Sequence, residues 1–329
     1  MTSAPLAARL RIPSGPLFFP VTAFGPDGAV DLGAYRAHVR AGIDAGGAAV
    51  FACCGTGEFH ALTPEEFQAC VAAAVEESAG RVPVVAAAGY GTALAVRYAR
   101  LAEEAGADGL LAMPPYLVVA EQEGLLRHYT ELADATGLDV IVYQRDNAVF
   151  TPATVARLAR HPRIIGLKDG RGDLDLMQGI ISAVRTEGEG VDEFLYFNGL
   201  PTAEWTQLAY HGIGVTLYSS AAFCFAPEVA LAFHGALNAG DTALATRLLD
   251  RFYGPLVRLR DSGRGYAVSL VKAGVRLRGL DVGPVRPPLT EPDEAAVKAL
   301  TDLIEEGRAA AAAGAGAAAG PEGPQGGVA

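Results

Sequence analysis

Short apolar runs alternate with helix-length amphipathic segments along most of this 329-residue chain, and this alternation constrains its fold more than any other feature. We count eight apolar runs of strand length, each followed by a segment with helical periodicity. Parallel strands need a crossover connection, usually a helix, so repeated strand and helix pairs indicate a parallel sheet. Eight pairs over roughly 230 residues match a closed (β/α)8 barrel, or TIM barrel, better than an open doubly wound sheet.

The elements of this α/β barrel are expected at definite places in the sequence. The predicted strands are 17–22, 48–54, 83–88, 109–113, 139–143, 164–168, 194–198 and 213–217. The predicted helices between and after them are 32–45, 64–78, 92–104, 121–135, 152–160, 174–185, 202–210 and 228–238.

Four segments follow from where this alternation starts and stops. Residues 1–13 form an N-terminal extension, and residues 14–238 form the barrel. Residues 239–307 carry only helical patterns, expected as helices at 241–260, 266–278 and 293–307, and make a helical C-terminal region. Residues 308–329 are rich in Ala and Gly and nearly free of charge, so we expect a disordered tail.

Composition and charge exclude several classes of protein. Half of the residues are apolar and 19% are charged, so the chain can bury a large core. Lys and Arg number 26 against 37 Asp and Glu, and the net charge of −11 opposes nonspecific binding to nucleic acid or anionic membrane. No run of uninterrupted apolar residues is long enough to span a bilayer. We therefore expect no nucleic-acid or membrane partner, while the overall charge leaves room for a local basic pocket that binds an anionic substrate.

The N-terminus and the cysteines indicate a compartment. Residues 1–13 lack the apolar core and the cleavage site of a signal peptide. Cys53, Cys54, Cys70 and Cys224 show no Cys-x-x-Cys spacing, and the adjacent pair is poorly placed for a disulfide framework or a zinc cluster. The histidines include no His-x-x-x-His pair. We expect a cytoplasmic protein that uses no metal and no other cofactor.

A single lysine closes the sixth predicted strand. Residues 164–170 read Ile-Ile-Gly-Leu-Lys-Asp-Gly, an apolar run that delivers Lys168 to the strand end just before an Asp-Gly turn. Active sites of α/β barrels lie at this end of the strands. A lysine at the rim of an apolar barrel loses solvation, so its amine deprotonates more easily and can attack a carbonyl as a Schiff-base nucleophile. The alternative is a structural lysine that snorkels at a strand end.

Other strand ends carry polar groups that could work with the lysine. Gly55, Thr56 and Gly57 follow the second strand, where glycines let backbone N–H groups approach a ligand and the threonine adds a hydroxyl, an arrangement suited to a carboxylate. Tyr143 closes the fifth strand, and its phenol could shuttle protons to a carbinolamine, although packing alone would also explain it. Arg145 could bind a second carboxylate or simply face solvent.

Together these stretches resemble the dihydrodipicolinate synthase and N-acetylneuraminate lyase superfamily. The resemblance runs from about residue 17 to residue 304 and rests on Gly-Thr-Gly-Glu at 55–58, on Tyr143 and on Gly-Leu-Lys-Asp at 166–169. It implies a (β/α)8 barrel with a helical C-terminal region and a homo-oligomer, dimer or tetramer. It also implies that Lys168 forms a Schiff base with the ketone of a 2-oxo acid and that Tyr143 relays protons.

Departures from the synthase pattern indicate one branch of this superfamily. The synthases carry Gly-Thr-Thr-Gly-Glu, whose first threonine is Gly55 here, and Pro-Tyr-Tyr, whose second tyrosine is Leu117 here, so their proton relay cannot be built. Residues 54–63 and 142–147 are instead similar to the 5-dehydro-4-deoxyglucarate dehydratase branch. That resemblance implies a decarboxylating hydro-lyase that converts a six-carbon 2-oxo diacid to 2,5-dioxopentanoate, carbon dioxide and water. Tyr-Ser-Ser at 218–220 fits this branch, and Ser219 or Ser220 could hold substrate hydroxyls.

Other functions stay open on the sequence. A 2-keto-3-deoxy sugar acid aldolase or a related lyase would use the same imine but break the bond between C3 and C4, releasing pyruvate instead of carbon dioxide. A non-catalytic sugar-acid-binding sensor on the same barrel would bind its ligand without forming an imine. The products and the presence of an imine therefore distinguish these functions.

Overall fold

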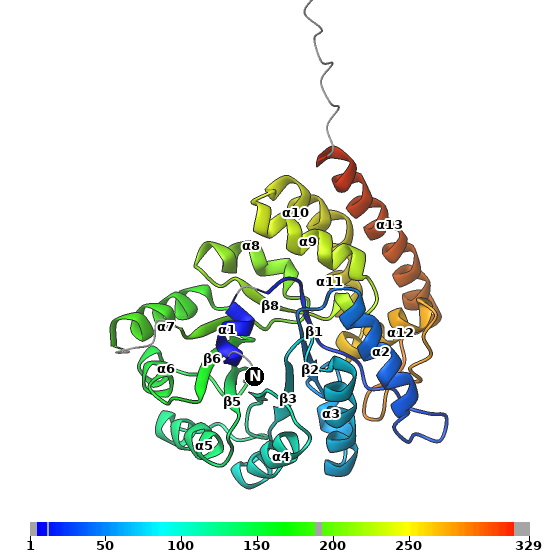
Figure 1. Cartoon of the computed structure of the whole chain (residues 1–329). Coiled ribbons are helices and arrows are strands. Elements are labelled where there is room, and N and C mark those ends of the chain that lie inside the picture. Colours follow the sequence, from blue (N-terminus) through cyan, green and yellow to red (C-terminus); the bar gives the residue numbers. More distant parts are fainter. Residues whose placement is uncertain (1–4, 12, 188–192, 319–329) are drawn as a thin grey trace, which may run out of the picture.

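The computed structural model describes residues 5–11, 13–187 and 193–318. Eight parallel strands close into a barrel in chain order, with β1 paired to both β2 and β8. This confirms the predicted (β/α)8 barrel (Figure 1). The strands are β1 (Leu17–Phe18), β2 (Ala49–Ala52), β3 (Val84–Ala88), β4 (Gly109–Ala112), β5 (Asp139–Gln144), β6 (Ile164–Asp169), β7 (Leu195–Asn198) and β8 (Leu217–Ser220).

A helix follows every strand and covers the outside of the barrel (Figure 1). These helices are α2 (Leu32–Asp44), α3 (Pro64–Ser78), α4 (Thr92–Glu104), α5 (Gln122–Asp134), α6 (Pro152–Ala159), α7 (Leu174–Glu187), α8 (Glu204–Gly212) and α9 (Pro227–Ala239). The start of α3 shows how the sequence sets their position. The Thr63 side chain accepts from the Glu66 N–H, and the Glu66 side chain accepts from the Thr63 N–H. This capping box satisfies N–H groups that a helix start leaves unpaired.

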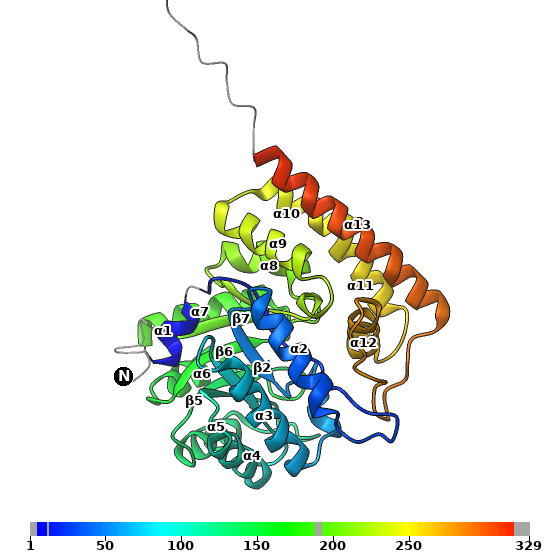
Figure 2. The ribbon, with the colours of Figure 1, turned by 45° about the vertical axis from the view of Figure 1, so that its right-hand side comes forward.

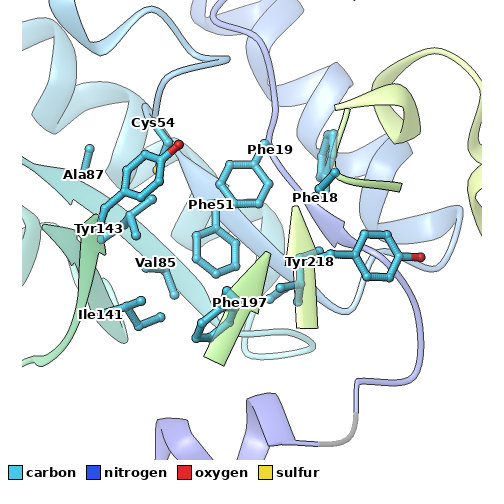
Figure 3. Close-up of a cluster of buried hydrophobic side chains, with 14 of the residues drawn as sticks. Phe18, Phe19, Phe51, Cys54, Val85, Ala87, Ile141, Tyr143, Phe197 and Tyr218 are labelled. Carbon is cyan, nitrogen blue, oxygen red and sulfur yellow. The ribbon is translucent and has the colours of Figure 1, made fainter. Parts of the chain in front are cut away.

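Aromatic and aliphatic side chains fill the barrel interior (Figure 3). The rings of Phe19 and Phe51 stack with their centroids 4.4 Å apart, and Phe197 belongs to the same cluster. Every residue of β2, β3 and β4 is buried, as expected for parallel strands that carry helices on their outer face. Tyr218 points away from Phe51 and Phe197 (Figure 3), and its ring packs near Phe233 and His234 of α9. Because the interior is packed, a ligand has room only at an end of the barrel.

A short helix that the sequence did not predict lies at the amino end of the barrel. Helix α1 (Leu6–Arg11) buries Leu6, Ala7 and Leu10, and Arg9 forms an ion pair of 2.6 Å with Asp108 just before β4. Six residues are too few to give a helical period that can be read from the sequence. The segment 1–13, expected only as an extension, therefore contains a helix, while residues 1–4 and 12 lie outside the described residues.

The chain continues after α9 as the expected helical C-terminal region. It consists of α10 (Thr242–Leu248), a π-helix (Leu249–Tyr253), α11 (Gly254–Asp261), α12 (Tyr266–Leu277) and α13 (Glu294–Ala318). Helix α13 runs alongside α9, α10, α11 and α12 (Figure 2). Within the residues that the structure describes, no helix has the length and apolar character needed to cross a membrane.

One predicted strand was misplaced and another was predicted too long. The eighth strand is Leu217–Ser220 instead of 213–217, because α8 continues to Gly212 and the Val215 N–H then bonds back to the Tyr210 carbonyl. The apolar residues at 213–215 therefore form the end of a helix and a turn. The first strand pairs over only two residues, although the segment to Thr22 that follows it is buried.

Two predictions for the C-terminal region also differ from the structure. The helix expected at 241–260 is interrupted by the π-helix, since Pro255 has no N–H to donate to the preceding turn. Helix α13 runs to Ala318, so residues 308–318 of the expected tail are helical instead of disordered. Alanine has the highest helix propensity, which outweighs the glycines here. Residues 319–329 lie outside the described residues.

Candidate active site

A cavity of about 200 Å³ opens at the carboxyl ends of the strands. One part of its wall consists of strand-end residues, among them Thr56, Tyr143, Lys168 and Ser219. The other part comes from α11 and α12 of the C-terminal region. This is the end at which α/β barrels carry their active sites. The barrel and the C-terminal helices therefore enclose one candidate site.

The charged side chains that line this cavity are all positive. They are Lys168, Arg145 and Arg260, and the described lining contains no Asp or Glu. The whole chain carries a net charge of −11, so the charge of the cavity lining is opposite in sign to the net charge of the protein. Asp146 and Asp261, which lie outside the lining, pair with Arg145 and Arg260 and compensate part of this charge. The charge that faces the cavity is still positive and favours an anionic ligand.

Lys168 is buried beneath this cavity near the end of β6, with 6% of its surface exposed. Its ammonium lies over the rings of Phe19 and Tyr143, 4.2 and 4.7 Å from their centroids. Burial lowers the pKa of Lys168 to about 8, with nearby Cys54 acting in the opposite direction and Arg145 in the same one. Lys168 is therefore the neutral amine, the form that attacks a carbonyl, in a larger fraction of molecules than an exposed lysine would be.

Tyr143 stands directly opposite Lys168 on the neighbouring strand. The register of β5 and β6 pairs these two residues. The Tyr143 hydroxyl donates a hydrogen bond of 2.9 Å to the Gly199 carbonyl, and Arg145 Nη1 lies 3.5 Å from that hydroxyl. Burial raises the pKa of the Tyr143 phenol, although Arg145 opposes this effect. The phenol therefore stays protonated next to the lysine, where it can donate a proton.

Gly55 and Thr56 line the cavity, but Gly57 does not. The Gly57 carbonyl accepts a hydrogen bond of 2.7 Å from the Thr22 hydroxyl. A Cβ atom at Gly57 would lie 3.0 Å from the Cα of Cys53, so glycine is required here for close approach of two backbone segments. The predicted ligand-binding turn therefore contributes two residues to the cavity instead of three.

Ser219 also lines the cavity, whereas Ser220 does not. Ser220 is fully buried, donates a hydrogen bond of 2.5 Å to Glu204 and accepts one from the Phe223 N–H. Successive side chains of a strand point to opposite faces, so only one of the two serines can face the ligand. Burial raises the pKa of Glu204 to about 7 behind the strand.

Cys54 shows that a positive neighbour does not always make a thiol reactive. Its thiol lies near Lys168, which favours the thiolate, but burial outweighs this effect and raises the pKa of Cys54 to about 12. The thiol therefore stays protonated and serves as a packing group. Among the described residues, no group of three or more His, Cys, Asp and Glu side chains could hold a metal ion.

Several parts of the cavity wall were not predicted from the sequence, namely the turn Gly199–Thr202 after β7, Arg260 in α11 and the lining residues of α12. The turn had a usable signal, because it follows a predicted strand at the catalytic end of a barrel. Arg260 had none, since only the packing of the C-terminal helices brings it to the site.

A buried ion pair ties the loop after β2 to α12. Lys272 Nζ lies 3.0 Å from Glu58 Oε1, and both side chains are fully buried. Lys272 also donates to the Pro284 carbonyl at 2.7 Å, and the Arg286 N–H donates to Glu58 Oε2 at 2.9 Å. Glu58 itself has a φ of 57°, which is rare for a residue other than glycine. The acidic end of the Gly-Thr-Gly-Glu sequence therefore has a structural role.

We expect Lys272→Met to destabilise the protein by roughly 3 to 5 kcal/mol, because it leaves the Glu58 carboxylate buried without its ion-pair partner. The double variant Glu58→Gln/Lys272→Met removes both charges and should recover part of that loss. Urea unfolding at constant pH measures the free energy of unfolding of both variants. A double variant less stable than Lys272→Met would contradict this account of the pair.

Comparison with known proteins gives relatives over nearly the whole chain. The sequence signature of the Dihydrodipicolinate synthetase family matches residues 13–307. A protein of Streptomyces avermitilis named "Probable 5-dehydro-4-deoxyglucarate dehydratase 1" is 76% identical over 309 residues, which cover 94% of this chain and 98% of the relative.

Solved structures with the same fold cover a similar length. The dihydrodipicolinate synthase from Bacillus clausii has a TM-score of 0.83 and 25% identity, over 92% of this chain and 99% of that one. The chloride-inhibited dihydrodipicolinate synthase from Acinetobacter baumannii, complexed with pyruvate, has a TM-score of 0.79 and 25% identity, over 90% of this chain and 99% of that one.

Proposed function

The chain belongs to the Dihydrodipicolinate synthetase family, and within that family we propose that it is a decarboxylating dehydratase of 5-dehydro-4-deoxyglucarate. One observation carries the choice of a diacid: besides the lysine that forms the imine, Arg145 lines the cavity next to Tyr143, and the described wall has no acidic residue. The name of the Streptomyces avermitilis relative supports the particular diacid. No cofactor takes part in the chemistry proposed below.

The proposed binding mode uses both ends of the substrate, numbered here from the carboxylate beside the ketone. Thr56 and the neighbouring backbone N–H groups hold the C1 carboxylate, which places the C2 ketone at Lys168. Arg145 meets the distal C6 carboxylate. Ser219 holds a hydroxyl between them. Each of these residues lines the cavity.

The proposed reaction begins with an imine. The neutral amine of Lys168 attacks C2, and Tyr143 passes the protons that let the carbinolamine lose water. The positively charged imine nitrogen makes the C3 protons acidic. Loss of one of them gives an enamine, whose electrons expel the C4 hydroxyl as a second water. The product of this step is an imine conjugated with a double bond between C3 and C4.

This conjugated imine accepts the electrons of decarboxylation. The bond between C5 and C6 breaks, carbon dioxide leaves, and the electron pair moves through C4 and C3 to the imine nitrogen. Protonation at C3 leaves an enol across C4 and C5, which becomes an aldehyde at C5. Water then hydrolyses the imine, releasing 2,5-dioxopentanoate and free Lys168.

Product analysis tests this function. Incubation with 5-dehydro-4-deoxyglucarate should release one carbon dioxide per substrate and yield 2,5-dioxopentanoate, detected by mass spectrometry. The matched control is 2-keto-3-deoxygluconate, which lacks the second carboxylate and should release no carbon dioxide. Pyruvate as the product would identify an aldolase instead. Binding without an imine that borohydride can trap would identify a sensor.

The proposed enzyme is a homo-oligomer, a dimer or a tetramer. Tyr116, Leu117, Val118 and Val119 after β4 expose 66, 79, 56 and 85% of their surface. A contiguous exposed apolar segment of this kind is typical of a protein interface. Sedimentation analysis of the protein with Leu117→Asp and Val119→Asp tests this, and an unchanged mass would contradict the role of the segment.

We place the enzyme in the cytoplasm. The four cysteines are all free thiols, which suits a reducing compartment. Cell fractionation with an antibody against the native protein tests this, and enrichment outside the cytoplasmic fraction would contradict it.

A further inference from the structure

One side chain of the C-terminal helical region reaches the turn next to the reacting groups. Arg260 lies in the last turn of α11 and lines the cavity, with 17% of its side chain exposed. Its Nη1 donates to the Pro201 carbonyl at 2.6 Å and to the Thr202 hydroxyl at 3.1 Å. Helix α11 therefore holds the turn Gly199–Thr202, which follows β7.

The same turn fixes the position of Tyr143 and confines Lys168. The carbonyl of Gly199 accepts the Tyr143 hydrogen bond, and the N–H of Gly199 donates to the Asp169 carbonyl at 2.6 Å. A Cβ atom at Gly199 would lie only 2.6 Å from the Cε of Lys168. Because the turn touches both side chains, any shift of the turn changes their relative position.

The turn is strained at the point where Arg260 holds it. Thr202 has a φ of 53°, a left-handed conformation that β-branched residues rarely adopt. Such a conformation persists only where the surrounding structure enforces it. Asn198 restrains the chain on one side by donating to the Ala203 carbonyl at 2.9 Å, and Arg260 restrains Thr202 itself. Removing Arg260 therefore removes a restraint directly at the strained residue.

The hydrogen bonds of Arg260 indicate that it holds the turn in place and does not bind a substrate carboxylate. Besides the two bonds of Nη1, its Nε and Nη2 donate to Asp261 at 2.8 and 3.2 Å. These four bonds occupy four of the five N–H groups of the guanidinium. The guanidinium is held in one orientation, with its positive charge at the cavity wall.

We propose that Arg260 is a positioning residue that holds the turn Gly199–Thr202 against Tyr143 and Lys168. The inference rests on the proposed function, in which these two residues form the imine. It gives the C-terminal helical region a part in the reaction, through the chain of contacts from α11 to the turn and from the turn to the phenol. The expected consequence of losing Arg260 is slower imine formation with any 2-oxo acid.

Borohydride trapping of pyruvate tests this proposal in Arg260→Ala, alongside turnover of 5-dehydro-4-deoxyglucarate. Pyruvate has no second carboxylate, so its trapping depends on the lysine and the tyrosine and not on distal recognition. We expect the trapping rate and kcat to fall by about 10- to 100-fold, the effect of a small misplacement of reacting groups, while KM changes little. Arg260→Lys keeps the charge but has one donor nitrogen in place of three, and should recover part of the rate. Arg258→Ala, an exposed residue of the same helix outside the cavity, should trap normally.

Three results would overturn the proposal. Unchanged pyruvate trapping in Arg260→Ala, with a raised KM for the diacid, would assign Arg260 to the distal carboxylate instead. No adduct on the wild-type protein would overturn the Schiff-base function and this inference together. If Arg260→Ala does not fold, Thr202→Val removes only the hydroxyl acceptor; slower trapping supports the proposal and an unchanged rate overturns it.

Discussion

Replacing Lys168 by alanine is expected to lower turnover by at least about 10⁴-fold, the scale on which removal of a nucleophile acts in enzymes. Lys168 is the one lysine in the described lining of the cavity, so no second amine can take over. Intact mass after incubation with pyruvate and borohydride should show one reduced adduct on the wild-type protein and none on Lys168→Ala.

A lysine on the surface provides the matched control for this experiment. Lys298 is 77% exposed in its side chain, pairs with Asp302 on α13 and does not line the cavity. Lys298→Ala should keep both the adduct and the turnover. A full adduct on Lys168→Ala would contradict the proposed nucleophile and assign the imine to another amine.

The trapping rate should also depend on pH in a way set by burial of the lysine. Burial lowers the pKa of Lys168 to about 8, so the neutral amine is the main form above this pH and falls about tenfold per unit below it. The rate should therefore rise with pH and level off above about pH 8. Arg145→Met removes a nearby positive charge that lowers this pKa, so it should move the profile to higher pH.

The barrel was predictable because its signal is local and repeated. Each strand is a short apolar run and each helix has its own period, so the order of elements follows without knowledge of any long-range contact. The prediction failed where a local pattern fits two structures equally well. Residues 213–215 lack polar side chains, as a strand would, but they form the turn after α8, in which the Val215 N–H bonds to the Tyr210 carbonyl.

The central part of the candidate site was predictable for a related reason. Lys168 and Tyr143 close neighbouring strands, and parallel strands end at the same edge of a sheet, so the two residues had to lie close together. Arg260 could not be found in this way. It contacts Pro201, which lies 59 residues earlier in the chain, and no local pattern links the two.

The choice between Ser219 and Ser220 needed the structure for a different reason. Strand alternation tells us that the two serines face opposite sides, but not which one faces the ligand. If one face of the sheet were exposed to solvent, the pattern of polar and apolar residues along the strand would show which serine lies on that face. Here both faces of β8 are covered, so a serine is equally compatible with either side. Only Glu204, which accepts from Ser220 behind the strand, settles the orientation.

Gly199→Ala is expected to lower turnover and pyruvate trapping by about 10²-fold or more while leaving the protein folded. The new Cβ would lie 2.6 Å from both Cγ and Cε of Lys168 and 2.9 Å from the Asp169 carbonyl oxygen. The lysine can move, but the backbone carbonyl cannot, so the turn must shift and carry away the acceptor of Tyr143. Steady-state kinetics and thermal unfolding measure the two effects, and overpacking of this kind costs about 1–3 kcal/mol.

Gly235→Ala is the control, because its Cβ would meet no atom within 4 Å and alanine favours a helix such as α9. It should keep full activity, and normal trapping in Gly199→Ala would contradict the tight fit of the turn over Lys168.

The double variant Gly199→Ala/Arg260→Ala tests whether the two residues act through the same turn. Gly199→Ala displaces the turn from the cavity side, and Arg260→Ala releases it from the α11 side. If both act through the same turn, the double variant should lose less activity than the product of the two single losses, since coupled changes are not additive in free energy. Losses that multiply would mean that Arg260 and Gly199 act independently.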